Sequence, residues 1–241
     1  MGVAPVSVPK SLALVLNSAG DKSGVDFDYL LQTAIRESSL NPEAKATGSS
    51  AVGLFQFLES TWLQTMREQG PALGYSKYAD AISRNSDGDY YVADANKRAV
   101  ILGLREDPQI AADLAAAFTR SNGEYLESAF GRRPSAGELY IAHFLGAQGA
   151  EKMFRAGLAD PDQSAVSLFP RQARANPTIF YADGQARTVR EVYKALVAQH
   201  TGASSGGTTI EVDSGFTTQQ IASGVPPRWP IDDVPSRLLN T

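Results

Sequence analysis

The stretch Ala34-Ile35-Arg36-Glu37-Ser38-Ser39-Leu40-Asn41-Pro42, followed by Gly53-Leu54-Phe55-Gln56-Phe57, decides the fold of this chain. The first stretch closes an amphipathic helical pattern, in which Leu30, Ala34 and Glu37 stand at i, i+4 and i+7 and share one face. We expect that face to turn toward the interior. Partial burial disfavours the charged form of a carboxyl group, and a protonated carboxyl group is what a general acid requires. Glu37 is therefore the first catalytic candidate, while the structural alternatives are a solvated surface residue or a buried ion pair.

Composition indicates one sizeable domain or two small ones. The chain has 241 residues, 43% of them hydrophobic, and a net charge of −4. With a pI of about 5.3 and no basic stripe, it does not have the charge pattern of a nucleic-acid-binding protein. There is no cysteine, which excludes disulfides, thiolate metal sites and a cysteine nucleophile. We expect no metal and no cofactor.

Membrane and export signals are weak. No run of 18 apolar residues occurs, so we expect no membrane-spanning segment. Residues 10–17 contain an apolar part that is too short for a signal peptide, and no basic region precedes it. If the protein is exported, the signal has been removed from this chain or another route is used.

Helical patterns dominate from residue 11 to residue 200. We expect helix N-caps at Asp26 and Asp107, and capping boxes at residues 135–138 and 188–191. Asn41-Pro42 is expected to end the helix that carries Glu37. The only hairpin signal, at residues 180–185, is weak, and no convincing strand alternation is present.

The two ends of the chain differ from the middle. We expect residues 1–10 to be a flexible N-terminus, residues 11–200 to form one helical domain, and residues 201–241 to form a flexible tail rich in glycine, serine and proline. The tail is where we expect a protein partner to dock, if there is one.

A family resemblance follows from these residues. Glu37-Ser38, Asn41-Pro42 and the run Gly53-Leu54-Phe55-Gln56-Phe57 resemble the motifs of soluble lytic transglycosylases, which usually have Gly-Leu-Met-Gln at the second position. The similarity is clear over residues 27–66 and weaker as far as Gly149. The resemblance implies an all-α, lysozyme-like helical domain with additional C-terminal helices and the flexible tail.

The resemblance also implies a function. Members of the family act on peptidoglycan glycan strands, so we expect a periplasmic or cell-wall-associated enzyme. A single glutamate, here Glu37, protonates the bond between N-acetylmuramic acid and N-acetylglucosamine, and then helps the muramic 6-hydroxyl close a 1,6-anhydro ring. This differs from most glycosidases, which use two carboxyl groups.

Further site residues are carried over from the same motifs. Ser38 would orient the carboxylate or, alternatively, bond its own helix backbone. Gly53 would have a backbone role. Gln56 would line the cleft and hydrogen-bond either the substrate or groups of the catalytic loop. We place Ser38, Gly53, Phe55 and Gln56 in the substrate-binding group. Phe55 stands where the family has methionine and would either stack on a sugar ring or belong to the core.

The family's third motif, Ala-Tyr-Asn-Ala-Gly, is altered to Ala142-His143-Phe144-Leu145-Gly146. His143 takes the tyrosine position, and Tyr140 lies one turn earlier on the same face. We expect both in the substrate-binding group, although His143 is equally compatible with a core histidine.

Two other functions stay open. A hydrolytic muramidase would let water replace the 6-hydroxyl, and a second acid about 6.5–9.5 Å from Glu37 would favour it. A non-catalytic wall-binding or assembly module of a secretion or flagellar system would retain the fold without turnover. The altered third motif favours this module, whereas the retention of Glu37 argues against it.

Overall fold

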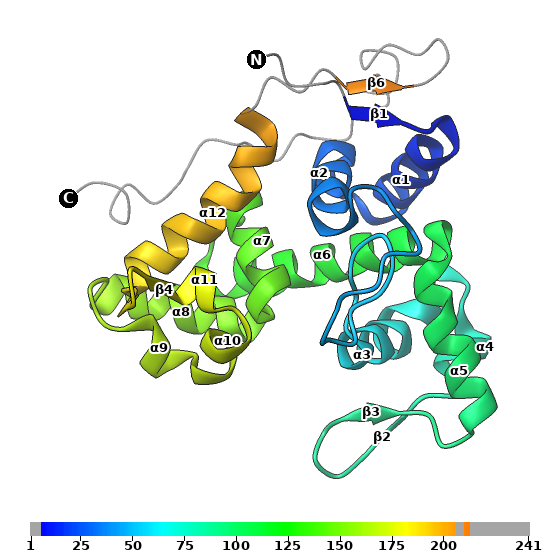
Figure 1. Ribbon diagram of the computed structural model, residues 1–241. Helices are drawn as coiled ribbons and strands as arrows, with labels where there is room; N and C mark the ends of the chain where they lie inside the picture. The colour runs from blue at the N-terminus through cyan, green and yellow to red at the C-terminus, as the bar shows by residue number, and fades with distance from the viewer. Residues whose placement is uncertain (1–5, 206–209, 213–241) are drawn as a thin grey trace. The chain divides into compact units, whose positions relative to one another are not determined.

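The computed structural model describes residues 6–205 and 210–212, with side chains described for residues 7–199. Helices dominate the described residues, which confirms the all-α prediction (Figure 1). The chain forms two compact units that divide between Arg120 and Ser121. The sequence analysis expects residues 11–200 to form one domain with additional C-terminal helices, and those additional helices lie in the second unit.

The first unit contains the expected catalytic region. Its elements are β1 (Val6–Val8), α1 (Lys10–Ser23), α2 (Phe27–Ser38), α3 (Glu59–Gln69), η1 (Gly70–Leu73), α4 (Ser76–Ala79), β2 (Ser83–Arg84), β3 (Tyr90–Tyr91), α5 (Ala95–Gly103), η2 (Leu104–Glu106) and β6 (Ile210–Val212). The long helix α6 (Pro108–Phe130) begins in this unit and continues into the second.

The second unit has its own hydrophobic core. Its further elements are α7 (Ala136–Leu145), α8 (Ala147–Ala159), α9 (Ala165–Leu168), α10 (Pro170–Ala175), α11 (Pro177–Phe180), β4 (Tyr181–Ala182), β5 (Gln185–Ala186) and α12 (Val189–Ser205). Aromatic residues from α8, α11 and α12, among them Phe154, Phe180 and Tyr193, are buried together. This apolar cluster explains how a region without a recognisable motif forms a compact body.

Helix α2 begins where the sequence predicts and ends earlier. The Asp26 carboxylate caps its N-terminus by accepting hydrogen bonds from the N–H groups of Asp28 and Tyr29. The last helical residue is Ser38, and the chain then leaves the helix through two left-handed residues, Ser39 (φ 53°) and Leu40 (φ 65°). The prediction that Asn41-Pro42 ends the helix is therefore wrong by three residues, because the turn is completed before the proline can restrict its neighbour.

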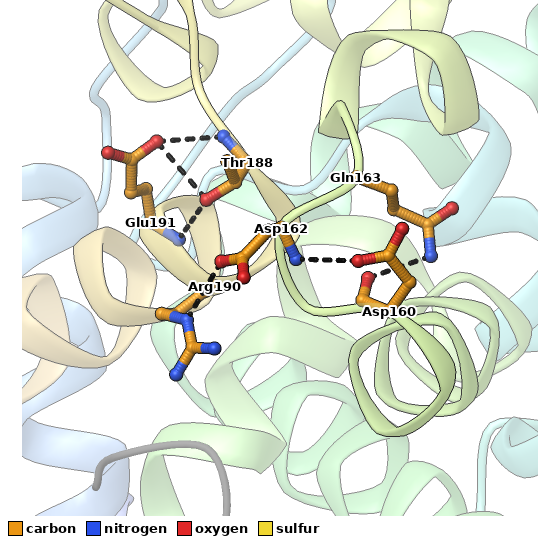
Figure 2. A network of polar contacts seen from close by, with 6 residues as sticks. All are labelled: Asp160, Asp162, Gln163, Thr188, Arg190 and Glu191. Atoms are coloured by element: carbon orange, nitrogen blue, oxygen red, sulfur yellow. Dashed lines mark hydrogen bonds and ion pairs between the residues drawn. The ribbon is translucent and has the colours of Figure 1, made fainter. Parts of the chain in front are cut away.

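The capping boxes are confirmed. Ser135 and Glu138 cap α7 reciprocally. At the start of α12, the Thr188 N–H donates to the Glu191 carboxylate at 2.8 Å, and the Glu191 N–H donates to Thr188 Oγ1 at 3.2 Å (Figure 2). Both boxes satisfy N–H groups that would otherwise lack partners at the helix start.

Thr188→Ala is expected to lower the free energy of unfolding by about 1 kcal/mol, because one N–H group of α12 loses its side-chain acceptor. Urea unfolding followed by circular dichroism measures the change. Ser167→Ala, which alters an exposed hydroxyl group on α9, is the matched control and should leave the urea midpoint unchanged. Equal midpoints for both variants would contradict a stabilising cap.

Short strands are the main departure from the sequence analysis. β4 and β5 pair antiparallel, which confirms the weak hairpin signal, and the turn residues Asp183 and Gly184 both have positive φ, as type I′ hairpins require. β2 and β3 also pair antiparallel. These strands have two residues each, too few for alternation to be read from the sequence.

The chain ends also differ from expectation. β1 lies within residues 1–10 and pairs in parallel with β6, which lies within the expected tail. Helix α12 continues to Ser205, beyond the expected end at residue 200. The pairing joins segments about 200 residues apart in sequence, so local patterns could not indicate it. The rest of the expected tail lies outside the described residues.

No helix among the described residues is long and apolar enough to cross a membrane.

Candidate active site

Glu37 lies in the last turn of α2, with 20% of its side chain exposed. Leu30 and Ala34, on the same face, are fully buried, so the predicted inward direction of this face is confirmed. The neighbouring Arg36 guanidinium forms an ion pair with the Glu37 carboxylate, with 3.5 Å between Nε and Oε1. The side chain is thus mostly buried and retains some contact with solvent.

The loop between α2 and α3, residues 39–58, folds into a compact structure beside this helix (Figure 1). Val52 and Phe57 exchange backbone hydrogen bonds of 3.2 and 3.1 Å, and the Gly53 N–H donates to the Ala44 carbonyl at 2.8 Å. Leu54 and Phe55 are buried between these bonds. The motif run, residues 53–57, is therefore held in place by backbone hydrogen bonds and burial. We call this fixed segment the platform.

Gly53 is required by its surroundings. Its φ is +87°, and a Cβ added there would overlap the carbonyl oxygen of Arg105 and lie 2.9 Å from the Arg105 carbonyl carbon. The predicted backbone role is supported: only glycine combines this conformation with so close an approach. Its contacts are with protein backbone, and its place in the substrate-binding group stays a prediction.

Ser38 connects the helix to the loop. Its hydroxyl oxygen lies 3.1 Å from the Ala34 carbonyl oxygen and 2.9 Å from the Leu54 carbonyl oxygen. The hydroxyl has one proton and donates to one of these oxygens at a time. Ser38 therefore bonds its own helix, as the second alternative states, and it also tethers the loop next to Glu37. Its predicted role in orienting the carboxylate stays a prediction.

Gln56 supports the loop from within. Its amide nitrogen donates to the carbonyl oxygens of Ala44 at 3.1 Å and Gly53 at 2.9 Å. Its backbone has a φ of +47°, which is unusual for a residue other than glycine. Both amide protons are used in these bonds, so any contact of the side-chain amide with substrate would use the amide oxygen.

Phe55 is a core residue. Only 1% of its surface is exposed, and a buried ring offers no free face to a sugar. The prediction that Phe55 binds substrate is corrected here: the alternative, core packing, is what the structure contains. Phe57 is buried as well and packs edge-on against Trp62 at 5.2 Å between ring centroids.

Tyr140 and His143 both lie on α7, in the second unit. Their rings stack with centroids 6.2 Å apart and an interplanar angle of 16°, which confirms that they share a face. Tyr140 is 5% exposed, and its hydroxyl donates to Gln199 Oε1 at 3.2 Å. Their contribution to a site with Glu37 stays a prediction, since they belong to a different unit.

Arg105 was missed by the sequence analysis. It is 8% exposed, and burial lowers the pKa of its guanidinium group. Its Nη1 donates to the carbonyl oxygens of Ser50 at 2.6 Å and Phe57 at 3.2 Å. Its only sequence signal is an arginine in an otherwise apolar stretch before Asp107-Pro108, which is too common to single out.

Among the described residues, no group of three or more His, Asp or Glu side chains is placed to hold a metal ion.

The comparison with known families points to the first unit. The family model described as the transglycosylase SLT domain matches residues 15–99. The matched segment begins in α1 and ends in α5, so it contains Glu37, Ser38 and the whole loop between α2 and α3. It does not extend to Tyr140 and His143, whose assignment rests on the altered third motif alone.

Proposed function

We propose that this chain, whose residues 15–99 match the family model of the transglycosylase SLT domain, is a lytic transglycosylase that uses Glu37 as its acid and base. The family match supports an enzyme of the lytic transglycosylase type that acts on peptidoglycan. The finer proposal concerns the bond and the product. The enzyme cleaves the β-1,4 bond between N-acetylmuramic acid and N-acetylglucosamine and leaves a 1,6-anhydromuramic end.

One observation carries the assignment of Glu37. Its side chain is 20% exposed at the end of α2, beside a loop whose backbone is fixed by hydrogen bonds from Gln56 and Arg105. A general acid gains from such a setting, because a hydrogen bond to the leaving oxygen is stronger where water is largely excluded. The next residue, Ser38, is bonded to that loop through the Leu54 carbonyl, which supports a defined position for Glu37, and proton transfer depends on such a position.

The reaction needs no water in this scheme. Glu37 donates its proton to the glycosidic oxygen as the bond from C1 to that oxygen breaks, and the N-acetylglucosamine hydroxyl leaves. The substrate's own N-acetyl group stabilises C1. The muramic 6-hydroxyl then bonds to C1 and returns its proton to the Glu37 carboxylate, which restores the acid. The substrate thus supplies the second catalytic group.

The products distinguish this reaction from hydrolysis. Digestion of purified peptidoglycan, followed by chromatography and mass spectrometry of the muropeptides, is expected to give 1,6-anhydro ends. These ends have the mass of the hydrolytic product minus one water. Borohydride reduction is the control, because it alters reducing ends and leaves anhydro ends unchanged. Reducing ends as the main product would instead assign a hydrolytic muramidase.

We also propose that the protein acts in the periplasm or at the cell wall, where this substrate is found. Support comes from the substrate class that the family implies. Fractionation of the producing cells, with immunodetection of the full chain, tests this location. Recovery in the cytoplasmic fraction alone would contradict it.

A further inference from the structure

The segment that follows α5 is hydrogen-bonded to the loop beside Glu37 through one buried arginine. Arg105 lies in η2, and its Nη1 donates to the carbonyl oxygens of Ser50 and Phe57. Its Nε donates to the Leu102 carbonyl at 2.9 Å, at the end of α5. One rigid guanidinium group therefore joins both ends of residues 50–57 and fixes them to η2.

Two further contacts join the same segments. The Gly53 Cα packs directly against the Arg105 carbonyl group. On the outside, Lys45 Nζ and Glu106 Oε1 form an ion pair of 3.0 Å, with side chains 64% and 36% exposed. Exposed ion pairs contribute little, whereas buried charged groups interact strongly with their hydrogen-bond partners. The main connection between η2 and the loop is therefore Arg105.

The loop in turn is attached next to Glu37. The Leu54 carbonyl, between Ser50 and Phe57, accepts a hydrogen bond from Ser38 Oγ at 2.9 Å. A continuous path thus runs from Arg105 through residues 50–57 to Ser38, the residue after Glu37. All of these residues belong to the first compact unit.

We propose that Arg105 is a positioning residue: by holding the carbonyl groups of Ser50 and Phe57, it fixes the loop against α2 and keeps Glu37 in its productive place. The proposal rests on the function of Glu37 proposed above. Arg105 acts through the loop and does not contact the substrate. A role limited to stability would lower the amount of folded enzyme and leave the turnover of the folded fraction intact.

The kinetic test uses Arg105→Met and Arg105→Lys in the full chain, with Arg98→Met as the matched control. Arg98 is half-exposed and pairs with Glu59. Assayed on purified, peptide-free glycan strands and normalised to folded enzyme, Arg105→Met should lose about 100-fold in kcat, as expected for a misplaced catalytic group. The kcat loss should exceed any change in KM. Arg105→Lys retains charge and donors, so it should recover part of kcat, and Arg98→Met should match the wild type.

Hydrogen exchange provides a readout that does not need activity. The amides of Val52 and Phe57, which bond each other's carbonyl groups, should exchange faster in Arg105→Met and at the wild-type rate in Arg98→Met. If Arg105→Met does not fold, Arg105→Lys takes its place in both measurements. Full kcat in folded Arg105→Met, or a loss seen only in KM, would overturn the proposal.

The two proposals fail in different ways. If the wild type does not cleave the glycan strands, the proposed function fails, and hydrogen exchange alone reports whether Arg105 holds the loop. If the wild type cleaves and Arg105→Met exchanges faster with unchanged kcat, the positioning role fails while the enzyme assignment stands. Unchanged hydrogen-exchange rates of the Val52 and Phe57 amides in Arg105→Met would show that Arg105 does not hold the loop in place.

Discussion

Glu37→Gln is expected to lower peptidoglycan cleavage by about 100- to 10,000-fold, the range that general acid–base catalysis contributes. The amide has nearly the same shape as the carboxyl group, but it can neither donate the proton to the glycosidic oxygen nor accept one from the 6-hydroxyl. Clearing zones in gels that contain purified peptidoglycan give a first measurement, and turbidity loss of a peptidoglycan suspension gives the rate. The thermal midpoint should stay close to that of the wild type, because the amide side chain retains the packing of Glu37 on the Leu30 face.

Glu43→Gln is the matched control for this substitution. Glu43 lies in the loop that follows α2 and is exposed, so its charge can be removed without disturbing a buried contact, and the rate should match the wild type. Equal clearing by Glu37→Gln and the wild type would remove Glu37 from the reaction. If neither protein clears peptidoglycan while both bind it in a pull-down, the non-catalytic wall-binding module would become the better description.

The parts of the fold that could be predicted are those with a local cause. Asp26 and the boxes at residues 135–138 and 188–191 each have a side chain that reaches a helix N–H within three residues, so the sequence alone identifies the helix start. The inward direction of Glu37 is equally local, since it follows from the spacing to Leu30 and Ala34. These predictions are confirmed by the contacts in the structure.

The parts that could not be predicted depend on distant segments. β1 and β6 are each three residues long and lie at opposite ends of the chain, so neither has a pattern of its own. Arg105 contacts Ser50 across 55 residues, and an isolated arginine does not show which carbonyl groups it will meet. The boundary at Arg120 and Ser121 falls inside α6, where the helical pattern is continuous.

The sequence identified which residues lie together near Glu37 more accurately than it identified what each of them contacts. The sequence analysis left open whether Phe55 and Gln56 contact a sugar or build the protein, and Gly53, Phe55 and Gln56 each have a contact that builds the loop. A motif shows that residues belong together. A single sequence does not distinguish side chains that hold the platform from side chains that contact a ligand. Burial and hydrogen-bond partners separate the two.

Gly53→Ala is the second substitution with a large expected effect, because it tests the platform without altering a functional group. A Cβ at this position would overlap the Arg105 carbonyl oxygen, and the φ of +87° is unfavourable for alanine. Backbone strain and overpacking together should destabilise the first unit by about 2–6 kcal/mol. The loop can only relieve the overlap by moving away from η2, so the folded variant should also lose about 100-fold in turnover through the displacement of Glu37.

Gly48→Ala separates the two causes. Gly48 lies in the same loop with a φ of +82°, but an added Cβ would meet no atom within 4 Å. It therefore introduces the conformational strain without the overlap and should cost about 1–2 kcal/mol, with turnover near that of the wild type. Urea unfolding and the rate per folded molecule measure both quantities. Equal losses in the two variants would mean that left-handed strain alone explains the Gly53 effect, and that contact with Arg105 does not hold the loop in place.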